Sequence, residues 1–283
     1  MSRENKPAID TISLSVSCVT FRSNQLILSD TIESLLNSCE QAKRSGSLNY
    51  VEVFLIDNGP NVENLSILQF VQQKYKGRFD FIHIITGHGN IGYGKGNNLA
   101  INKTDCSYHL IINPDIIVDK ENISLAVRYL EINDDVGMLA PHALDQYGHT
   151  HYIAKRYPGF LVLLTRALKL KFMQKLFRDR LYDYEYRDKI PAQHPLEIEL
   201  ASGCYMFCRT DILKKLGGFD PRFFMYFEDF DLSMRLRQSK KIMHLHELQV
   251  IHLGGGASAK GWLHIHYFCT SLFQFFGRYH FKF

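Results

Sequence analysis

Residues 12–21 read ISLSVSCVTF, a β-rich run that predicts a strand. The segment after Asn24 carries apolar side chains at helical spacing and predicts a helix: Leu28, Ile32, Leu35, Leu36 and Cys39. The alternation then repeats, with strands expected at 51–56, 79–85, 108–112 and 136–140 and helices at 62–75, 97–102 and 122–132. Strands that alternate with helices predict an α/β fold, in which a mainly parallel sheet is covered on both faces and binds ligands at the carboxyl ends of its strands.

The pattern changes after Pro141. Residues 161–177 form a long basic amphipathic segment, and a second apolar block spans 198–208. A helix is expected at 229–238, a strand near Val250, and a helical tail dense in aromatic residues at 261–283.

The composition is that of a globular protein. Of the 283 residues, 46% are hydrophobic and 22% are charged, which excludes a disordered chain, collagen and a coiled coil. Lys and Arg number 33 against 29 Asp and Glu, and the net charge of +4 is below that of a dedicated nucleic-acid-binding protein. We therefore expect no nucleic acid, whereas anionic small molecules and anionic lipid are compatible partners.

The first residues and the cysteines bear on cellular location. Met1 to Asp10 are polar and lack the apolar stretch of a secretory signal, so the chain is expected in the cytosol. The six scattered cysteines are expected to stay thiols there. No apolar run approaches the roughly 18 to 20 residues that span a bilayer, which leaves attachment to a membrane surface open.

Two of the expected strands end in acidic turns, Asp57-Asn58-Gly59 and Asn113-Pro114-Asp115. An acidic residue just past a strand can accept a hydrogen bond from a base or a ribose hydroxyl, and one held by a preceding proline can ligate Mg2+ or Mn2+. Taken singly, each turn is better interpreted as a turn or helix cap. Their position at a shared edge of the sheet makes the pair a candidate site.

A glycine-rich segment, GHGNIGYGKG at 87–96, satisfies the GxGxxG dinucleotide fingerprint but follows the third strand rather than the first. Its glycines let the backbone approach a diphosphate or a sugar and then open a helix N-terminus. A plain flexible loop explains the same residues equally well.

The stretch GGFDPRFFMYFEDFDL at 217–232 places three carboxylates, Glu228, Asp229 and Asp231, among large apolar groups. On a solvated helix such a run means little beyond favourable charge at the helix N-terminus. Aromatic neighbours that partly desolvate one carboxylate would raise its pKa, which suits a general base.

These motifs together resemble those of the inverting GT-A glycosyltransferases of family 2, especially bacterial rhamnosyltransferases that build surface polysaccharides such as O-antigen. The resemblance covers about 12–256 and rests on several motifs in the same order: Asp57-Asn58-Gly59, Asn90-Ile91-Gly92-Tyr93-Gly94 with Asn97-Asn98, Asn113-Pro114-Asp115, Ser202-Gly203, Gly217 to Leu232, and Val250-Ile251-His252. It implies a GT-A domain at 1–256, with a donor half at about 12–140 and an acceptor and catalytic half at about 141–256, followed by the tail at 257–283.

The resemblance also implies roles for individual residues. Asp229 would be the catalytic base, and Asp115 would hold Mg2+ or Mn2+ on the donor diphosphate. His252 is either a further metal or phosphate ligand or a structural histidine. Donor contacts are expected at Thr20, Asp57, Asn58, Gly89, Asn90, Gly92, Gly94, Asn97, Asn113 and Asp115. Support for the acceptor or the transition state is expected at Glu228, Asp231, Ser202 and Gly203.

The favoured donor is dTDP-L-rhamnose, on the resemblance alone, with a UDP-hexose as the alternative and a lipid-linked or growing polysaccharide as acceptor. A nicotinamide-dependent oxidoreductase and a non-catalytic nucleotide-sugar-binding protein are the rival classes. Residues 166–180 hold six basic residues against one acidic residue, which is compatible with an anionic interface at the inner face of the cytoplasmic membrane. Packing of this segment and of the tail on the catalytic domain, or on a second subunit as in a homodimer, is the alternative.

Overall fold

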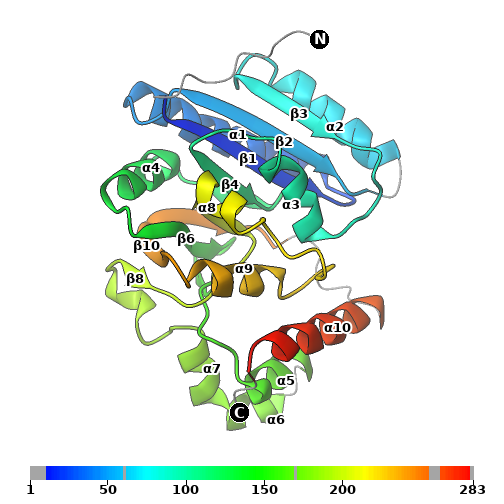
Figure 1. The fold of residues 1–283 in the computed structure, drawn as a ribbon, viewed down its shortest axis with the longest axis vertical. Helices are drawn as coiled ribbons and strands as arrows, with labels where there is room; N and C mark the ends of the chain where they lie inside the picture. The colour runs from blue at the N-terminus through cyan, green and yellow to red at the C-terminus, as the bar shows by residue number, and fades with distance from the viewer. Residues whose placement is uncertain (1–10, 60–61, 169–170, 255–261, 281–283) are drawn as a thin grey trace.

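The computed structural model describes residues 11–59, 62–168, 171–254 and 262–280. A twisted sheet crosses the molecule, and helices cover both of its faces (Figure 1). The strands are β1 (Ser13–Thr20), β2 (Tyr50–Asp57), β3 (Phe81–Ile85), β4 (Tyr108–Ile112), β5 (Ile116–Val118), β6 (Val136–Asp145), β7 (Thr150–His151), β8 (Leu196–Glu197), β9 (Tyr205–Arg209) and β10 (Lys241–His252). The helices are α1 (Gln25–Arg44), α2 (Val62–Lys74), α3 (Tyr93–Ile101), α4 (Asn122–Ile132), α5 (Phe160–Leu168), α6 (Lys171–Leu176), α7 (Arg178–Tyr184), α8 (Thr210–Lys215), α9 (Glu228–Leu236) and α10 (Trp262–Arg278), with a 3-10 turn, η1, at Ile190–Ala192.

The described strands form one sheet in the order β3, β2, β1, β4, β9, β6, β10, β5, with β7 beside β6 and β8 beside β10. The first four strands in this order run parallel, as the sequence predicted. Strand β9 is antiparallel to both of its neighbours, whereas β6 and β10 are again parallel. Because β9 comes from the second half of the chain and lies between β4 and β6, the two halves share a single sheet. The expected boundary at residue 256 lies outside the described residues.

Asn24 caps the N-terminus of helix α1, and its side-chain oxygen accepts hydrogen bonds from the N–H groups of Leu26 and Ile27 at 2.9 and 3.2 Å. The apolar stripe predicted for this helix is buried in the main core: Leu28, Ile32, Leu35, Leu36 and Cys39. Burying each leucine or isoleucine contributes about 1.5–3 kcal/mol, so the stripe fixes α1 against the sheet.

The central strand β1 is buried along its whole length. Its even-numbered residues from 14 to 18 lie in the main core, whereas Ser15 and Ser17 bind the two ring nitrogens of His109 at 2.6 and 2.9 Å. Burial lowers the pKa of His109 to about 3, so the ring is neutral and its polar atoms are paired inside the protein.

Helix α3 begins at Tyr93, four residues before the expected start. Gly94 and Gly96 lie inside this helix. Only glycine fits at both positions, because a Cβ on Gly94 would lie 2.8 Å from Phe219 and one on Gly96 3.0 Å from Val19. Half of the glycine-rich segment therefore serves close packing rather than an open turn. Strand β5 and helix α8 were not expected, because three and six residues are too few to show a period.

The apolar block at 198–208 is a strand only from Tyr205 onward. The N–H groups of Ala201 and Gly203 instead donate to Ser233 and Asp229 of α9. In the first part of this apolar block, contacts with α9 therefore take the place of pairing within the sheet.

The basic segment forms α5 and α6, and residues 169–170 lie outside the described residues. No helix in the described part of the chain is long and apolar enough to cross a membrane. The six cysteines are free, as expected.

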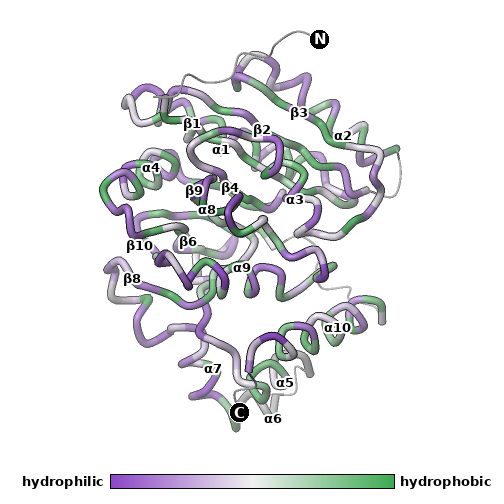
Figure 2. Tube along the Cα trace, in the orientation of Figure 1, coloured by the Kyte–Doolittle hydropathy of each residue, from purple (hydrophilic) through white to green (hydrophobic). Residues whose placement is uncertain are grey.

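Helix α10 confirms the helical tail as far as Arg278. Its Phe275 and Phe276 are buried in an aromatic cluster with Leu163 of α5 and with Phe223 and Phe227. Other large apolar residues of α10 are exposed: Trp262, Leu263, Ile265 and Phe273. Figure 2 shows the apolar residues of α5 and α10 gathered at this end of the molecule.

Candidate active site

The acidic turns lie at one edge of the sheet. Thr20 and Asp57 are paired in register at the ends of β1 and β2, and Asn113 follows β4 on the other side of β1. Because the chain leaves β1 toward β2 and returns on the far side at β4, this edge is the switch point at which open α/β sheets bind ligands.

Asp57 is buried at this edge, and three donors hold its carboxylate. Oδ1 accepts from Asn64 Nδ2 at 2.6 Å and from the Gly59 N–H at 3.0 Å, and Oδ2 accepts from Thr86 Oγ1 at 2.9 Å. A carboxylate has about four acceptor positions, so one position remains for a ligand. Gly59 is required because its Cβ would lie 2.5 Å from Asn64 Cβ.

Asn64, which holds Asp57 in place, belongs to none of the motifs in the sequence. This buried residue of α2 also donates to Thr20 Oγ1 at 3.0 Å and accepts from the Ser23 N–H at 3.0 Å. Its position on the same helical face as Leu68 and Val71 was the available signal.

Two expected donor contacts are internal instead. Thr20 is fully buried and donates to the Ile56 carbonyl at 2.9 Å, while Asn97 is fully buried and accepts from Ser17 Oγ at 2.6 Å. Asn97 Nδ2 also donates to the Tyr93 carbonyl at 3.1 Å. Both residues hold the strand-end region together from within and are closed to a ligand.

The glycine-rich turn is docked against the loop before α9. Gly92 has a φ of 90°, and a Cβ there would lie 2.3 Å from the Phe224 carbonyl oxygen. The same oxygen accepts from the Tyr93 N–H at 3.1 Å, and Asn58 Nδ2 donates to the Gly92 carbonyl at 2.9 Å. The turn therefore joins the Asp57 strand end to the 217–232 stretch.

Within this turn, Gly89 and Asn90 are exposed. The side-chain oxygen of Asn90 accepts a hydrogen bond from the Gly92 N–H at 3.1 Å. This part of the loop is open to a ligand. The first N–H of α3 is already bound to Phe224, which sets the segment apart from a dinucleotide-binding helix N-terminus.

Asp115, between β4 and β5, meets His252, the last residue of β10. Asp115 Oδ2 lies 3.4 Å from His252 Nε2. The pairing of β5 with β10 sets Ile116 opposite His252, and the Leu253 N–H donates to the Asp115 carbonyl at 2.9 Å. The ring of His151, from β7, stacks on His252 with centroids 5.1 Å apart.

This pair fits a divalent cation that is completed by a substrate. Cations such as Mg2+ are typically held by one or two carboxylates together with substrate phosphates and water. Across the described ranges, no group of three or more His, Cys, Asp or Glu side chains is arranged to hold a metal ion. Asp115 and His252 would therefore supply two ligands, and a diphosphate and water would supply the others.

Asp229 lies in the first turn of α9 and is half-buried. Oδ2 accepts from the Gly203 N–H and Oδ1 from the Phe230 N–H, both at 2.9 Å. On the far side of this turn the Tyr93 hydroxyl donates to the Gly203 carbonyl at 2.6 Å. The Ser202-Gly203 pair therefore connects the candidate base to α3 and to β9.

The two adjacent carboxyl groups differ in their surroundings. Burial raises the pKa of Asp229, and its two backbone donors act against that rise. Burial, and then the charge of Asp229, raise the pKa of Glu228 to about 8. Glu228 Oε2 is buried and has no hydrogen-bond partner in the described part of the chain. Asp229 therefore carries the negative charge more readily, and Glu228 stays protonated beside it.

Asp231 supports the structure rather than an acceptor. It is fully buried, and its oxygens accept from Arg235 Nε at 2.8 Å, Arg278 at 3.0 Å and Tyr279 Oη at 2.9 Å. The expected role in transition-state support is replaced by an ion-pair network that anchors α10.

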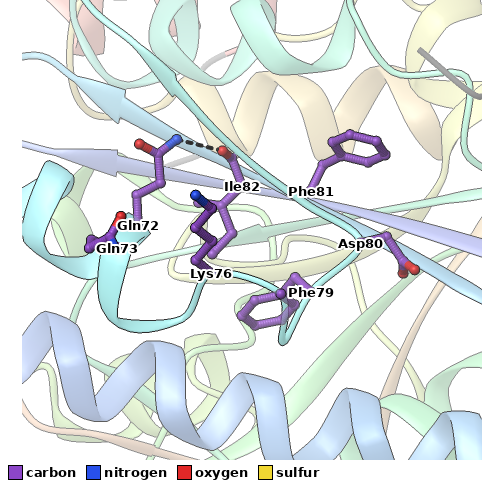
Figure 3. Close-up of a pocket in the computed structure, with 8 residues that line it drawn as sticks. Gln72, Gln73, Lys76, Phe79, Asp80, Phe81 and Ile82 are labelled. Atoms are coloured by element: carbon purple, nitrogen blue, oxygen red, sulfur yellow. Dashed lines mark hydrogen bonds between the residues drawn. The ribbon is translucent and has the colours of Figure 1, made fainter.

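A surface hollow of about 370 Å³ lies elsewhere, between the end of α2 and the start of β3 (Figure 3). Its walls include Gln72, Lys76 and Phe81, and Gln72 Nε2 donates to the Ile82 carbonyl at 2.7 Å. The hollow is at the amino end of β3, the opposite edge of the sheet from Asp57, and is separate from the site.

Residues 15–217 match the family model described as "Glycosyl transferase family 2", and the chain belongs to this family. The Escherichia coli rhamnosyltransferase WbbL is 25% identical over 194 residues, which cover 66% of this chain and 67% of that protein. An N-acetylglucosaminyl-diphospho-decaprenol L-rhamnosyltransferase of Mycobacterium tuberculosis is 23% identical over 214 residues, which cover 71% of this chain and 66% of that protein. The expected enzyme class, a glycosyltransferase, is confirmed.

The fold is that of GT-A glycosyltransferases. GalNAc-T7, solved with UDP, GalNAc and Mn2+, matches with a TM-score of 0.61 and 14% identity over 86% of this chain and 43% of that chain. The mannosyltransferase PcManGT from Pyrobaculum calidifontis, in complex with GDP-Man and Mn2+, matches with a TM-score of 0.57 and 10% identity over 86% of this chain and 58% of that chain. This chain thus spans about half the length of these solved chains and about two thirds of the curated relatives.

Proposed function

We propose that this protein is a metal-dependent inverting glycosyltransferase in which Asp229 is the general base. The placement of Asp229 supports this role, because two backbone N–H groups hold its carboxylate in a half-buried position. A carboxylate so held is fixed in direction and keeps the charge that a base needs. The fixed donors at Gly203 and Phe230 also limit the rotations open to it.

The reaction is a single displacement. An acceptor hydroxyl oxygen attacks the anomeric carbon while its proton passes to Asp229. The bond from the anomeric carbon to the diphosphate oxygen breaks, and its electron pair leaves with the nucleoside diphosphate. Attack from the side opposite the leaving group inverts the anomeric centre.

Asp115 and His252 would hold the cation on the donor diphosphate. The cation, when bound, offsets charge that builds on the leaving group. An imidazole ligand is typical of transition metals rather than of Mg2+, so the pair favours Mn2+. GalNAc-T7 and PcManGT were both solved with Mn2+, which supports this choice.

Asp57 would contact the donor base through its one remaining acceptor position. Thymine and uracil both carry an N3–H that can donate to a carboxylate. A contact of this kind accepts dTDP and UDP donors alike, so it leaves the choice between them to other residues.

For the donor we favour dTDP-L-rhamnose, with a lipid-linked or growing polysaccharide as acceptor. Two curated relatives that carry rhamnosyltransferase names support this choice. A UDP-hexose is the alternative, supported by the UDP with which GalNAc-T7 was solved.

The deciding test measures release of nucleoside diphosphate from a panel of donors, with and without a lipid-linked acceptor. Release only from UDP-sugars would overturn the rhamnose assignment, and no acceptor-dependent release from any donor would overturn the transferase assignment.

We place the enzyme in the cytoplasm, at the inner face of the cytoplasmic membrane. Helix α6 and the start of α7 expose Phe172 and Leu176 beside the exposed cations Lys175, Arg178 and Arg180. The exposed apolar side of α10 lies at the same end of the molecule (Figure 1). Apolar side chains beside cations suit an anionic lipid surface. Lys169, part of the same basic segment, lies outside the described residues.

A further inference from the structure

The loop that leads into α9 contains two consecutive residues in the left-handed region. Tyr226 has a φ of 69° and Phe227 a φ of 65°, and they directly precede Glu228 and Asp229. Such a conformation costs about 1–3 kcal/mol for each non-glycine residue and persists only where the surrounding structure enforces it. Something must therefore hold this loop in place.

Helix α10 supplies contacts to this part of the loop. Ser271 Oγ donates to the Met225 carbonyl at 2.8 Å, and His264 Nδ1 lies 3.0 Å from the Tyr226 hydroxyl. The Phe227 ring packs against Phe268 and Phe275, with centroids 5.4 Å from each. Each residue from 225 to 227 thus has a partner on α10.

The same helix holds the chain on the other side of the base. Arg278 and the adjoining Tyr279 bind the buried carboxylate of Asp231 at 3.0 and 2.9 Å. Upstream, Tyr267 packs its ring on Phe224 at 4.5 Å. The segment 224–231 is therefore attached to α10 at both ends, with Asp229 between the attachments.

We propose that α10 is a clamp that positions Asp229, acting through His264, Phe268, Ser271, Phe275, Arg278 and Tyr279. The inference rests on the proposed function, in which Asp229 is the base. The match to the family model ends at residue 217, so it covers neither the loop nor the clamp. These six residues then position the base, and their exposed neighbours on α10, such as Thr270 and Gly277, take no part.

The test uses the full chain with Ser271→Ala, and the exposed neighbour Thr270→Ala is the matched control. Ser271→Ala removes one buried hydrogen bond, which corresponds to about 2- to 10-fold in a population or a rate. We expect hydrogen exchange of segment 219–231, measured by mass spectrometry, to accelerate in Ser271→Ala and not in Thr270→Ala. Exchange in β1 to β4 should stay unchanged in both variants.

A second measurement distinguishes a change in the position of Asp229 from a loss of stability of the whole protein. Because the N–H groups of Gly203 and Phe230 act against the raised pKa of Asp229, a loosened loop should raise that pKa further. The acid limb of the kcat/KM profile should then move to higher pH in Ser271→Ala, with donor affinity unchanged by calorimetry. A loss of global stability alone would leave the limb in place.

Tyr279→Phe removes one hydroxyl from the other attachment and should give the same pattern. Unchanged exchange in both Ser271→Ala and Tyr279→Phe would overturn the clamp. Faster exchange of 219–231 with no shift in the acid limb would overturn the positioning of a base by α10. If the unaltered protein transfers no sugar from any donor, the proposed function fails, and the exchange data still decide whether α10 holds the loop.

Discussion

The backbone N–H of Gly203 donates a hydrogen bond of 2.9 Å to Oδ2 of Asp229. This bond joins the turn before β9 to the first turn of α9. The carbonyl of Gly203 accepts from Tyr93 Oη at 2.6 Å, so one residue links the candidate base to the helix that follows the glycine-rich turn.

Gly203→Ala should lower turnover with little change in donor affinity. The added Cβ would lie 3.2 Å from Tyr93 and 3.4 Å from Asp229 Cβ, so the N–H that binds Asp229 must shift. A hydrogen bond to a charged group contributes about 1.5–3 kcal/mol, which predicts a fall of roughly 10- to 100-fold in kcat. Gly277→Ala is the matched control, because a Cβ there meets nothing within 4 Å. Equal turnover in the two variants would contradict the role given to the Gly203 N–H.

Glu228→Gln should change how stability depends on pH. Because the pKa of Glu228 is raised in the folded protein to about 8, its protonated form is favoured there. The stability linked to this proton is fully present below the ordinary glutamate pKa and is lost as the pH rises through the raised value. Glutamine does not titrate. As the pH rises from about 5 to about 9, the calorimetric Tm of the unaltered protein should therefore fall relative to the Tm of the variant. If the difference in Tm between the two proteins is the same at every pH, Glu228 is not held protonated in the folded protein.

The order of strands and helices in residues 12–140 could be predicted from the sequence, because the buried strands are apolar runs and the apolar residues of α1 recur at helical spacing. The strand-end location of Asp57 and Asp115 followed for the same reason. The roles of Thr20, Asn97 and Asp231 could not be predicted, because a sequence motif does not show which of its side chains are buried inside the protein. Asn64 and the clamp on α10 were missed because their partners lie far away in the sequence, and only the folded chain brings them together.

Asp115→Ala and His252→Ala should each weaken donor binding in the presence of Mn2+. Both side chains would ligate the cation, so removing either also lowers the affinity for Mn2+ itself. Calorimetric titrations with and without the metal check this, and the exposed His149→Ala serves as the control. If Mn2+-dependent donor affinity is unchanged in both variants, Asp115 and His252 do not form the metal site.

Reversal of charge at Lys175 and Arg178 should weaken binding to anionic vesicles. Each cation near an anionic surface contributes about 1 kcal/mol, so the pair Lys175→Glu and Arg178→Glu should cost at least about 10-fold in affinity. Co-sedimentation with liposomes measures this, and binding should fall as salt is added. The exposed pair Lys76→Glu and Lys103→Glu makes the same change of charge elsewhere on the molecule. Absence of binding to anionic vesicles even at low salt would assign α6 to contact with protein or acceptor.

Asp229→Asn removes the proposed base, so the turnover of this variant decides whether Asp229 has that role. Asparagine keeps the shape of the side chain and an oxygen that can accept from Gly203, but it cannot take a proton from the acceptor hydroxyl. A positioned base contributes about 100- to 10,000-fold, so kcat should fall by roughly 100-fold or more while calorimetric donor affinity stays within about 2-fold. Turnover close to that of the unaltered enzyme, with the variant folded and binding donor, would contradict the assignment of Asp229 as the base.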